Sequence, residues 1–262
     1  MENVINRILL SECCNCQKIS YNCNMQYRNN ISAIEELASS ENGVFTTAQA
    51  ARLDVPRDAL SHAARSGRIE RICKGAYRVS GAPRHELDEL MAIWKLTSPD
   101  KFTYERVASF DGVAVGGTTA AWIHGIGDYW LTPYRLYAPT RVNTRNKSAS
   151  FVKRAIGGVD VEWKRGVPVT RVERTLFDLS KDGEEPSLLA DALRDAFRRY
   201  SNSPDLNYNR FAELFGDEGA ESLLELAGIR KVDGVREMAA TLEDGYDVVR
   251  VGHTGMSGFT GA

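Results

Sequence analysis

Two short helices predicted between Thr46 and Ser66 constrain this chain more than any other feature of its sequence. Thr46, followed three residues later by Gln49, is the pattern of a capping box, which predicts a helix over about 47–53. The next residues predict a tight turn, and Pro56 suits the first position of a second helix. Two short helices joined by a turn of a few residues are typical of a helix-turn-helix.

Gly67 suits the carboxyl-terminal cap of the second helix, and after it the hydrophobic period changes from that of a helix to that of a strand. Ile69 and Ile72 flank charged residues within 68–73, which predicts a strand. Lys74-Gly75 predicts a tight turn, and residues 76–79 predict a returning strand. A helix-turn-helix followed by such a hairpin predicts a winged helix.

The remaining sequence predicts a larger second domain, so we expect an α+β protein: an N-terminal winged helix-turn-helix followed by a larger mixed α/β domain. The turn-forming residues 80–83 interrupt the pattern and predict a linker. The expected divisions are a disordered leader over 1–30, a DNA-binding domain over 31–80, the α/β domain over 84–230 and a poorly ordered, Gly-rich tail over 231–262. Helices are expected over 31–40, 85–97, 119–124, 187–200, 208–215 and 218–227, with another opening at a capping box formed by Thr170 and Glu173; strands are expected over 113–115, 134–138 and 159–163.

The formal net charge of −2 is uninformative, but the distribution of charge is not. Lys and Arg outnumber Asp and Glu by three between Glu41 and Ser80, and by seven between Arg135 and Arg174. Such asymmetry is a reason to suspect nucleic acid as the partner of the basic parts, although a solvated mixed surface is an equal alternative on charge alone.

The predicted winged helix places donors where this fold meets DNA. The second helix of a helix-turn-helix enters the major groove, and Arg57 in its first turn is the best candidate for a bidentate contact to guanine. The amino end of the first helix, at Thr46, is a further candidate for a phosphate contact. The expected DNA-binding residues are Arg57, Ser61, His62 and Arg65 on the helix, and Arg68, Arg71 and Lys74 on the hairpin.

The four cysteines Cys13, Cys14, Cys16 and Cys23 precede the predicted domains. Their spacing fits no zinc finger, so we expect no metal there; a translation start at Met25 is an alternative explanation of this leader. No apolar run approaches the roughly 18 residues of a membrane span, and no signal peptide is evident, so a cytoplasmic location follows by default.

Residues 43–79 resemble the N-terminal domain of AbiEi-family antitoxins of type IV toxin–antitoxin systems, through the pattern Thr47, Ala51, Leu60, Gly67, Ile69, Arg71, Gly75, Tyr77 and Arg78. Two later blocks, 117–126 and 166–179, resemble the C-terminal region of the same family. Many relatives carry a Ser-His pair where this chain has Gly116-Gly117, which puts any role of that pair in doubt here.

The resemblance implies an antitoxin that binds inverted repeats in its own promoter as an autorepressor, with a C-terminal domain that counters a nucleotidyltransferase-like toxin. The implied partners are double-stranded operator DNA and that toxin, with no membrane and no cofactor. Because the winged helix is small, a homodimer or cooperative binding on DNA is expected.

Two other functions remain open from the sequence. One is a winged-helix regulator whose second domain senses a ligand. The other is a metal-dependent nuclease, because Glu162-Trp163-Lys164 has the E-x-K spacing of such sites and Asp111 or Asp128 is available as a further acid. No Ser-His-Asp order or phosphate-binding glycine loop is present, and we expect no catalytic residues.

Overall fold

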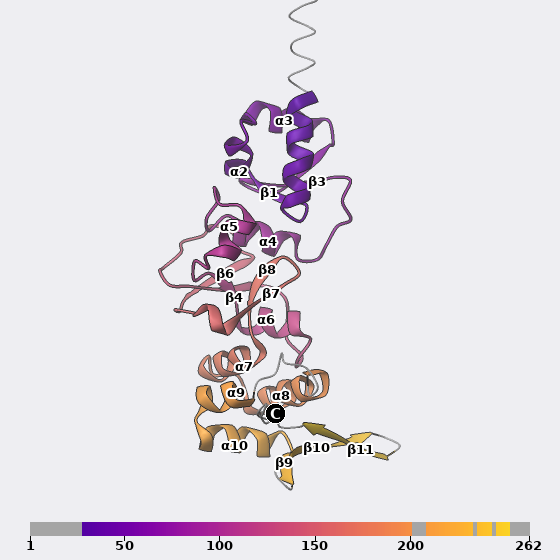
Figure 1. Ribbon diagram of the computed structural model, residues 1–262, viewed down its shortest axis with the longest axis vertical. Coiled ribbons are helices and arrows are strands. Elements are labelled where there is room, and N and C mark those ends of the chain that lie inside the picture. Colours follow the sequence, from indigo (N-terminus) through magenta and orange to yellow (C-terminus); the bar gives the residue numbers. More distant parts are fainter. Residues whose placement is uncertain (1–27, 201–207, 233–234, 243–244, 252–262) are drawn as a thin grey trace, which may run out of the picture. The chain divides into compact units, whose positions relative to one another are not determined.

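The structure is a computed structural model that describes residues 28–200, 208–232, 235–242 and 245–251 of the chain. It divides into two compact units, with the division after Phe110 (Figure 1). Each unit contains both helices and strands, which confirms the predicted α+β class. The four clustered cysteines and Met25 lie outside the described residues.

The first unit begins with a helix over residues 28–40 that takes in the last three residues of the predicted leader. It continues with β1 (Val44–Thr46), α2 (Thr47–Arg52), α3 (Arg57–Arg65), β2 (Ile69–Cys73) and β3 (Ala76–Val79). The strands form an antiparallel sheet in the order β1-β3-β2. This arrangement is the predicted winged helix-turn-helix, with the additional strand β1 that sequence analysis did not foresee.

The helices of this unit pack on the sheet through a continuous apolar core. Leu60 and Ala63 of α3 are buried, as their helical spacing predicts, and they join side chains from the first helix and from the sheet. Phe45 on β1 is completely buried and stacks on Tyr77 of β3 with ring centroids 6.0 Å apart. Burial of aromatic and branched side chains from all these elements makes the helix-turn-helix and the hairpin one folded body.

Two further helices, α4 (Asp88–Lys95) and α5 (Thr103–Ala108), belong to this first unit. A helix over 85–97 was expected from the sequence, but as part of the larger domain after a linker, and the helix α5 was not expected. In the structure every residue from Leu90 to Lys95 is buried, and α4 contacts β1, β2 and β3. A helix buried along its whole length needs neighbours on several sides, and the winged helix supplies them.

The second unit is built on a five-stranded sheet in the order β6-β5-β4-β8-β7. Its strands are β4 (Ala114–Val115), β5 (Tyr134–Ala138), β6 (Ala149–Lys153), β7 (Val161–Lys164) and β8 (Val167–Thr170). β6 pairs with β5 and β8 pairs with β4 in parallel, whereas the other neighbours are antiparallel. The strands β6 and β8 were not expected from the sequence.

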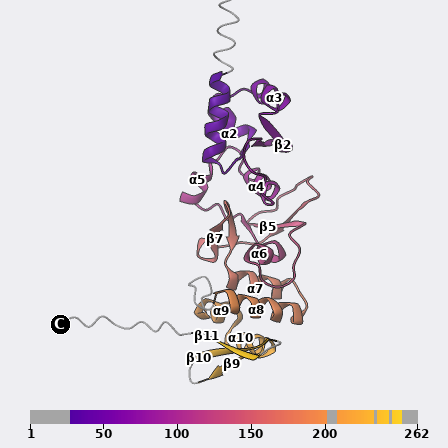
Figure 2. The ribbon, with the colours of Figure 1, turned by 90° about the vertical axis from the view of Figure 1, so that its right-hand side faces the viewer.

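Helices cover this sheet in successive layers (Figure 2). α6 (Gly117–His124) contacts β5 and α7 (Val172–Lys181), and α7 in turn contacts α8 (Pro186–Tyr200) and α9 (Tyr208–Phe215). α10 (Asp217–Leu226) completes the layer. Their shared core contains Leu176, Leu193, Phe197, Phe211 and Leu224.

Two details of the second unit correct the sequence-based expectations. Thr170 ends β8 instead of capping a helix, because its hydroxyl pairs with that of Thr175 while α7 starts at Val172. Residues 158–160 form a short 3-10 turn, so the strand predicted over 159–163 begins two residues later.

The predicted poorly ordered tail also contains regular structure. β9 (Ile229–Val232), β10 (Val235–Leu242) and β11 (Gly245–Val251) form an antiparallel sheet in the order β11-β10-β9. Asp233-Gly234 and Asp244-Gly245 are hairpin signals that would have predicted these strands. Residues 252–262 lie outside the description.

Candidate nucleic-acid interface

The capping box predicted at the start of α2 is present. The Gln49 amide nitrogen donates to Thr46 Oγ1 at 3.0 Å, and the Thr46 amide donates to Gln49 Oε1 at 2.8 Å. The turn then passes through Asp54 at φ 56°, and the Val55 amide donates to the Ala50 carbonyl at 3.0 Å. These local bonds fix the path by which the chain leaves α2 and enters α3.

Arg57, rather than Pro56, is the first residue of α3, so its side chain stands at the amino end of the second helix. Its guanidinium forms no hydrogen bond or ion pair with any described residue. Ser61, His62 and Arg65 are also exposed, on the side opposite Leu60 and Ala63. Hydrogen bonds along the helix hold two of them: Ser61 Oγ donates to the Arg57 carbonyl at 2.9 Å, and Arg65 Nε donates to the Ser61 carbonyl at 3.3 Å.

The wing carries the other three predicted residues, and all three are exposed. Arg71 Nε donates to the Cys73 carbonyl at 3.3 Å beside a bulge in β2. Arg68 lies 3.6 Å from Glu35, an ion pair too exposed to hold its side chain firmly. Lys74, at the turn, has no partner among the described residues.

Arg78 has a different role from the exposed arginines, although it lies on the same hairpin. It is 6% exposed, and its guanidinium lies 3.5 Å from Glu70 and 3.4 Å from Asp88. It also donates to the Ala82 carbonyl. The Tyr77-Arg78 signature of the wing therefore stabilises the fold through contacts inside the unit.

The amino end of α2 is used inside the unit, which corrects the expectation that it offers free amides to a phosphate. The Thr47 amide donates to the Gly75 carbonyl at 2.9 Å, and the Thr46 hydroxyl donates to the Pro99 carbonyl. Gln49 Nε2 donates to the Lys101 carbonyl at 2.8 Å. The segment between α4 and α5 thus covers this end of the helix.

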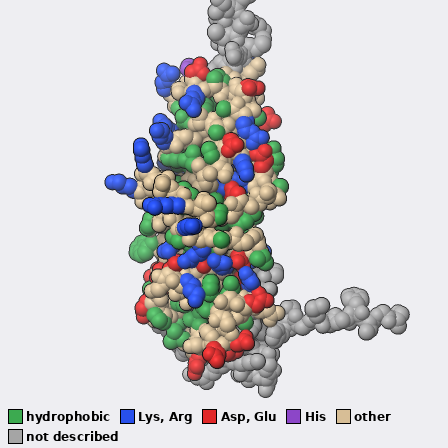
Figure 3. Space-filling view, turned by 90° about the vertical axis from the view of Figure 1, so that its left-hand side faces the viewer, with side chains coloured by type: hydrophobic (Ala, Val, Ile, Leu, Met, Phe, Trp, Pro, Cys, Tyr) green, Lys and Arg blue, Asp and Glu red, His purple; other side chains and the backbone are tan. Residues whose placement is uncertain are grey.

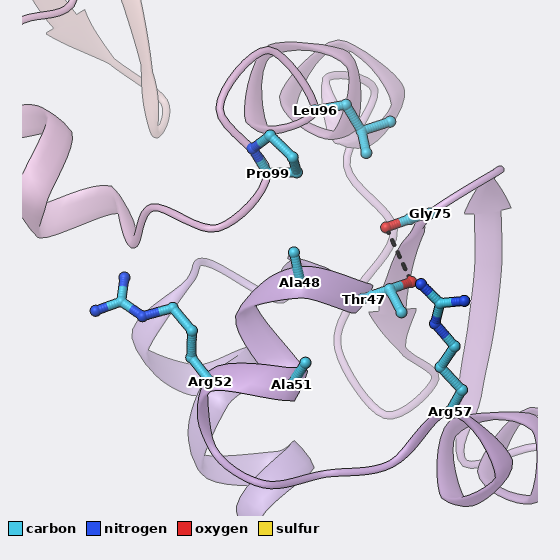
Figure 4. A pocket seen from close by; sticks show the side chains of 8 residues that line it. All are labelled: Thr47, Ala48, Ala51, Arg52, Arg57, Gly75, Leu96 and Pro99. Carbon is cyan, nitrogen blue, oxygen red and sulfur yellow. Dashed lines mark hydrogen bonds between the residues drawn. The ribbon is translucent and has the colours of Figure 1, made fainter.

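An open pocket of about 440 Å³ lies beside α2, bounded by the start of α3, the wing turn at Gly75, and Leu96 and Pro99 (Figure 4). Ala48 and Ala51 line it, with Arg52 and Arg57 on either side of α2. Arg52 is held by Glu105 through bonds of 2.6 and 3.0 Å. Arg57 is the pocket's unpaired cation, and its guanidinium points toward the wing turn (Figure 4).

The seven predicted residues therefore lie on the two elements that a winged helix presents to DNA, and all are exposed. Figure 3 shows basic side chains projecting separately from the N-terminal unit, at the upper end of the picture. Separate, exposed cations suit a polyanion with regularly spaced charges.

Burial raises the pKa of the Cys73 thiol, which keeps this half-buried wing residue neutral.

The E-x-K segment in the second unit forms an internal cluster. Lys164 Nζ lies 3.2 Å from Glu162 Oε1 and 3.0 Å from Nδ1 of His124, which is 2% exposed. His124 Nε2 lies 2.7 Å from the Thr170 carbonyl. Within the described residues, no three His, Cys, Asp or Glu side chains gather as metal ligands, so neither Asp111 nor Asp128 completes the nuclease site considered above.

Packing and backbone conformation explain the two glycines Gly116 and Gly117. A Cβ atom on Gly116 would lie 1.9 Å from the Tyr137 ring, and Gly117 has a φ of 54°. A larger side chain at the first position would collide with a completely buried aromatic ring.

The first unit has the fold of a winged helix, with exposed cations on α3 and on the wing. Residues 32–80 match the family model described as "Transcriptional regulator, AbiEi antitoxin", which confirms the resemblance for this module. No curated protein matches the sequence. Among solved structures, the crystal structure of RV2827C protein from Mycobacterium tuberculosis is similar, with a TM-score of 0.51 and 15% identity over 78% of each chain; at this identity it shows a shared fold alone. Within the described residues, no helix is long and apolar enough to span a membrane.

Proposed function

We propose that this protein is the antitoxin of a toxin–antitoxin operon and represses its own promoter through the winged helix. The observation that carries the DNA-binding part is the simultaneous exposure of Arg57 on α3 and of Arg71 and Lys74 on the wing. Countering a nucleotidyltransferase-like toxin would be the task of the second unit, and this part rests on the AbiEi description of the first.

In this proposal α3 lies in the major groove and Arg57 reads a guanine. A bidentate arginine–guanine contact discriminates against a wrong base by about 1–3 kcal/mol. An arginine that is already bound to a carboxylate would have to break that pair first, whereas Arg57 has no partner among the described residues. Ser61 and His62 follow one turn later and contact bases or phosphates.

Arg65, Arg68, Arg71 and Lys74 would contact phosphates, which orient the module without reading sequence. About five phosphate contacts give a slope of log K against log salt of roughly −4 to −5. Since one module this small binds weakly, two copies on an inverted repeat are expected.

The test is binding of the full chain to a duplex from its own upstream region, compared with an unrelated duplex of equal length. Arg57→Ala should weaken binding to the first duplex by about 1–3 kcal/mol and leave the second nearly unchanged. Lys74→Gln should weaken binding to both and make the salt slope shallower by about 0.9. Arg194→Gln, at a half-buried arginine of α8 that is paired with Asp191, is the control variant. Failure of the unaltered protein to bind its upstream duplex at low salt would contradict the proposal.

The antitoxin part is tested by co-expression with the downstream gene. Removal of residues 1–82 would be a poor experiment, because α4 and α5 would lose the winged helix on which they pack. The double variant Arg57→Ala/Arg71→Ala in the full chain should keep the fold, because both side chains are exposed. We expect it to lose repression of a promoter reporter while still rescuing growth; loss of rescue together with repression would contradict the division of labour.

A further inference from the structure

The helix α3 carries one acidic residue, Asp58, directly after Arg57. Its side chain is exposed, and its carboxylate forms no hydrogen bond or ion pair with any described residue. No side chain caps the amino end of α3 by a hydrogen bond, so Asp58 does not act as a cap. An acid in the first turn of a helix interacts favourably with the helix dipole, but salt screens that effect at an exposed position. This carboxylate is therefore a free acceptor within the described part of the first unit.

Asp58 lies at the centre of the outward face of α3. The buried residues Leu60 and Ala63 mark the inward face of this helix. At about 3.6 residues per turn, the direction opposite to their midpoint falls within about 10° of Asp58 and of Arg65. Arg57 lies at one border of the outward face, and its guanidinium points toward the wing turn (Figure 4). With α3 in the major groove, Asp58 therefore faces the base edges at the floor of the groove.

A carboxylate in that position has an electrostatic cost on DNA. The duplex carries one negative charge per about 1.7 Å of its axis, and like charges brought together at an interface repel each other. An ionised carboxylate offers acceptors and no donor, so only a donor on a base edge compensates it. What Asp58 contributes at the interface is then decided by which base it meets.

The four bases differ in what they present to an acceptor in the major groove. Guanine presents two acceptors, N7 and O6, and thymine presents O4 and a methyl group. Adenine places its N7 acceptor beside its N6 amino group. Cytosine presents a donor, its N4 amino group, without an acceptor of its own. A carboxylate is therefore attracted by cytosine and repelled by guanine or thymine.

We propose that Asp58 determines specificity by accepting a hydrogen bond from the N4 amino group of a cytosine in the operator. This inference rests on the proposed winged-helix function and deepens it, because it assigns a base to a further residue of α3. Arg57 and Asp58 then act as a donor and an acceptor on consecutive residues, the first reading guanine and the second cytosine. On unrelated sequences the repulsion between Asp58 and the DNA is not offset, so the same carboxylate also disfavours wrong sites.

The test measures base preference position by position with the full chain. Footprinting on the upstream duplex defines the protected site, and each base pair of that site is then changed in turn to the other three. Affinities are compared for the unaltered protein, Asp58→Ala and Asp58→Asn. Glu36→Ala, at an exposed acid of the first helix, changes the net charge equally and is the matched control. Circular dichroism melting checks folding, and Asp58→Asn, which keeps the shape of the side chain, carries the test if the alanine variant does not fold.

We expect the unaltered protein to prefer cytosine at one position of each half-site by about 5- to 150-fold. Asp58→Ala should lose the preference at that position alone and bind an unrelated duplex about fivefold more tightly. Asp58→Asn should prefer adenine at the same position, because an asparagine side chain bonds adenine N6 and N7 together. Glu36→Ala should keep the original preferences.

Unchanged preferences in the folded Asp58 variants would overturn this inference and leave the winged-helix function intact, because the carboxylate would then only stabilise the amino end of α3. Tighter binding to every duplex without a change of preference would overturn it as well, since that result shows repulsion without base reading. If the unaltered protein binds no DNA at low salt, the proposed function itself fails.

Discussion

Lys95 and Glu41 form an ion pair in which each side chain is 1% exposed. Glu41 lies just after the first helix and Lys95 ends α4, 54 residues later. The Thr103 amide also donates to Glu41 at 2.9 Å, and so does Gln49 Nε2 at the same distance. One buried carboxylate therefore joins the helix-turn-helix to α4 and α5.

Lys95→Met should destabilise the protein strongly. Burial lowers the pKa of Lys95 although Glu41 opposes this shift, so the ammonium already costs energy to bury. Its removal leaves a buried carboxylate without its cation, and we expect a loss of about 3–5 kcal/mol in the free energy of unfolding. Urea denaturation measures this, with exposed Lys101→Met as the control. A decrease of less than about 1 kcal/mol in the free energy of unfolding would show that the other donors to Glu41 stabilise its buried carboxylate without Lys95.

The same contacts predict where the first unit can be cut. A fragment over residues 28–110 should fold cooperatively, because it keeps Lys95, Thr103 and their partners. A fragment over 28–83 ends at the predicted linker and would expose Glu41, Gln49 and the surface that α4 covers. This shorter fragment should not fold cooperatively. Circular dichroism melting distinguishes them, and equal melting temperatures would contradict the assignment of α4 and α5 to this unit.

Gly116→Ala should destabilise the second unit by about 1–3 kcal/mol or more, because the new methyl group meets the ring of Tyr137. Gly81→Ala is the matched control, since a Cβ atom there has no heavy atom within 4 Å. Thermal melting of both variants tests this. If they melt alike, the ring moves aside and packing does not explain the glycine.

Tyr129 should contribute to alkaline unfolding. Burial raises its pKa to about 12, and its hydroxyl lacks a hydrogen-bond partner among the described residues. The unfolded state releases the proton near pH 10, so stability is kept below that pH and lost by up to about 1.4 kcal/mol per pH unit between 10 and 12. Tyr129→Phe should match the unaltered protein at pH 7 and be the more stable at pH 11. Tyr104→Phe, at a residue 66% exposed, should show no such gain.

The sequence predicted the winged helix because its signals are local. The cap at Thr46, the turn before Arg57 and the change of period after Gly67 all act within a few residues, and the structure contains each of them. The strands β9 to β11 could have been found in the same way from the two Asp-Gly pairs. The exposure of Arg57, Arg71 and Lys74 also agrees with the alternation of residue types.

Tertiary structure decided which charges remain available. Arg78 and Arg71 look alike in sequence, yet Asp88 from α4 helps to bury the first and leaves the second exposed. Arg135 and Arg154 belong to a basic run in the sequence, but Asp178 of α7 and Asp182, just after that helix, neutralise them. Likewise, the pairing of Glu41 with Lys95 and the packing of α4 on the three-stranded sheet assign α4 to the winged helix. Ion pairs and burial join residues tens of positions apart, and no periodicity or spacing along the chain records which ones will meet.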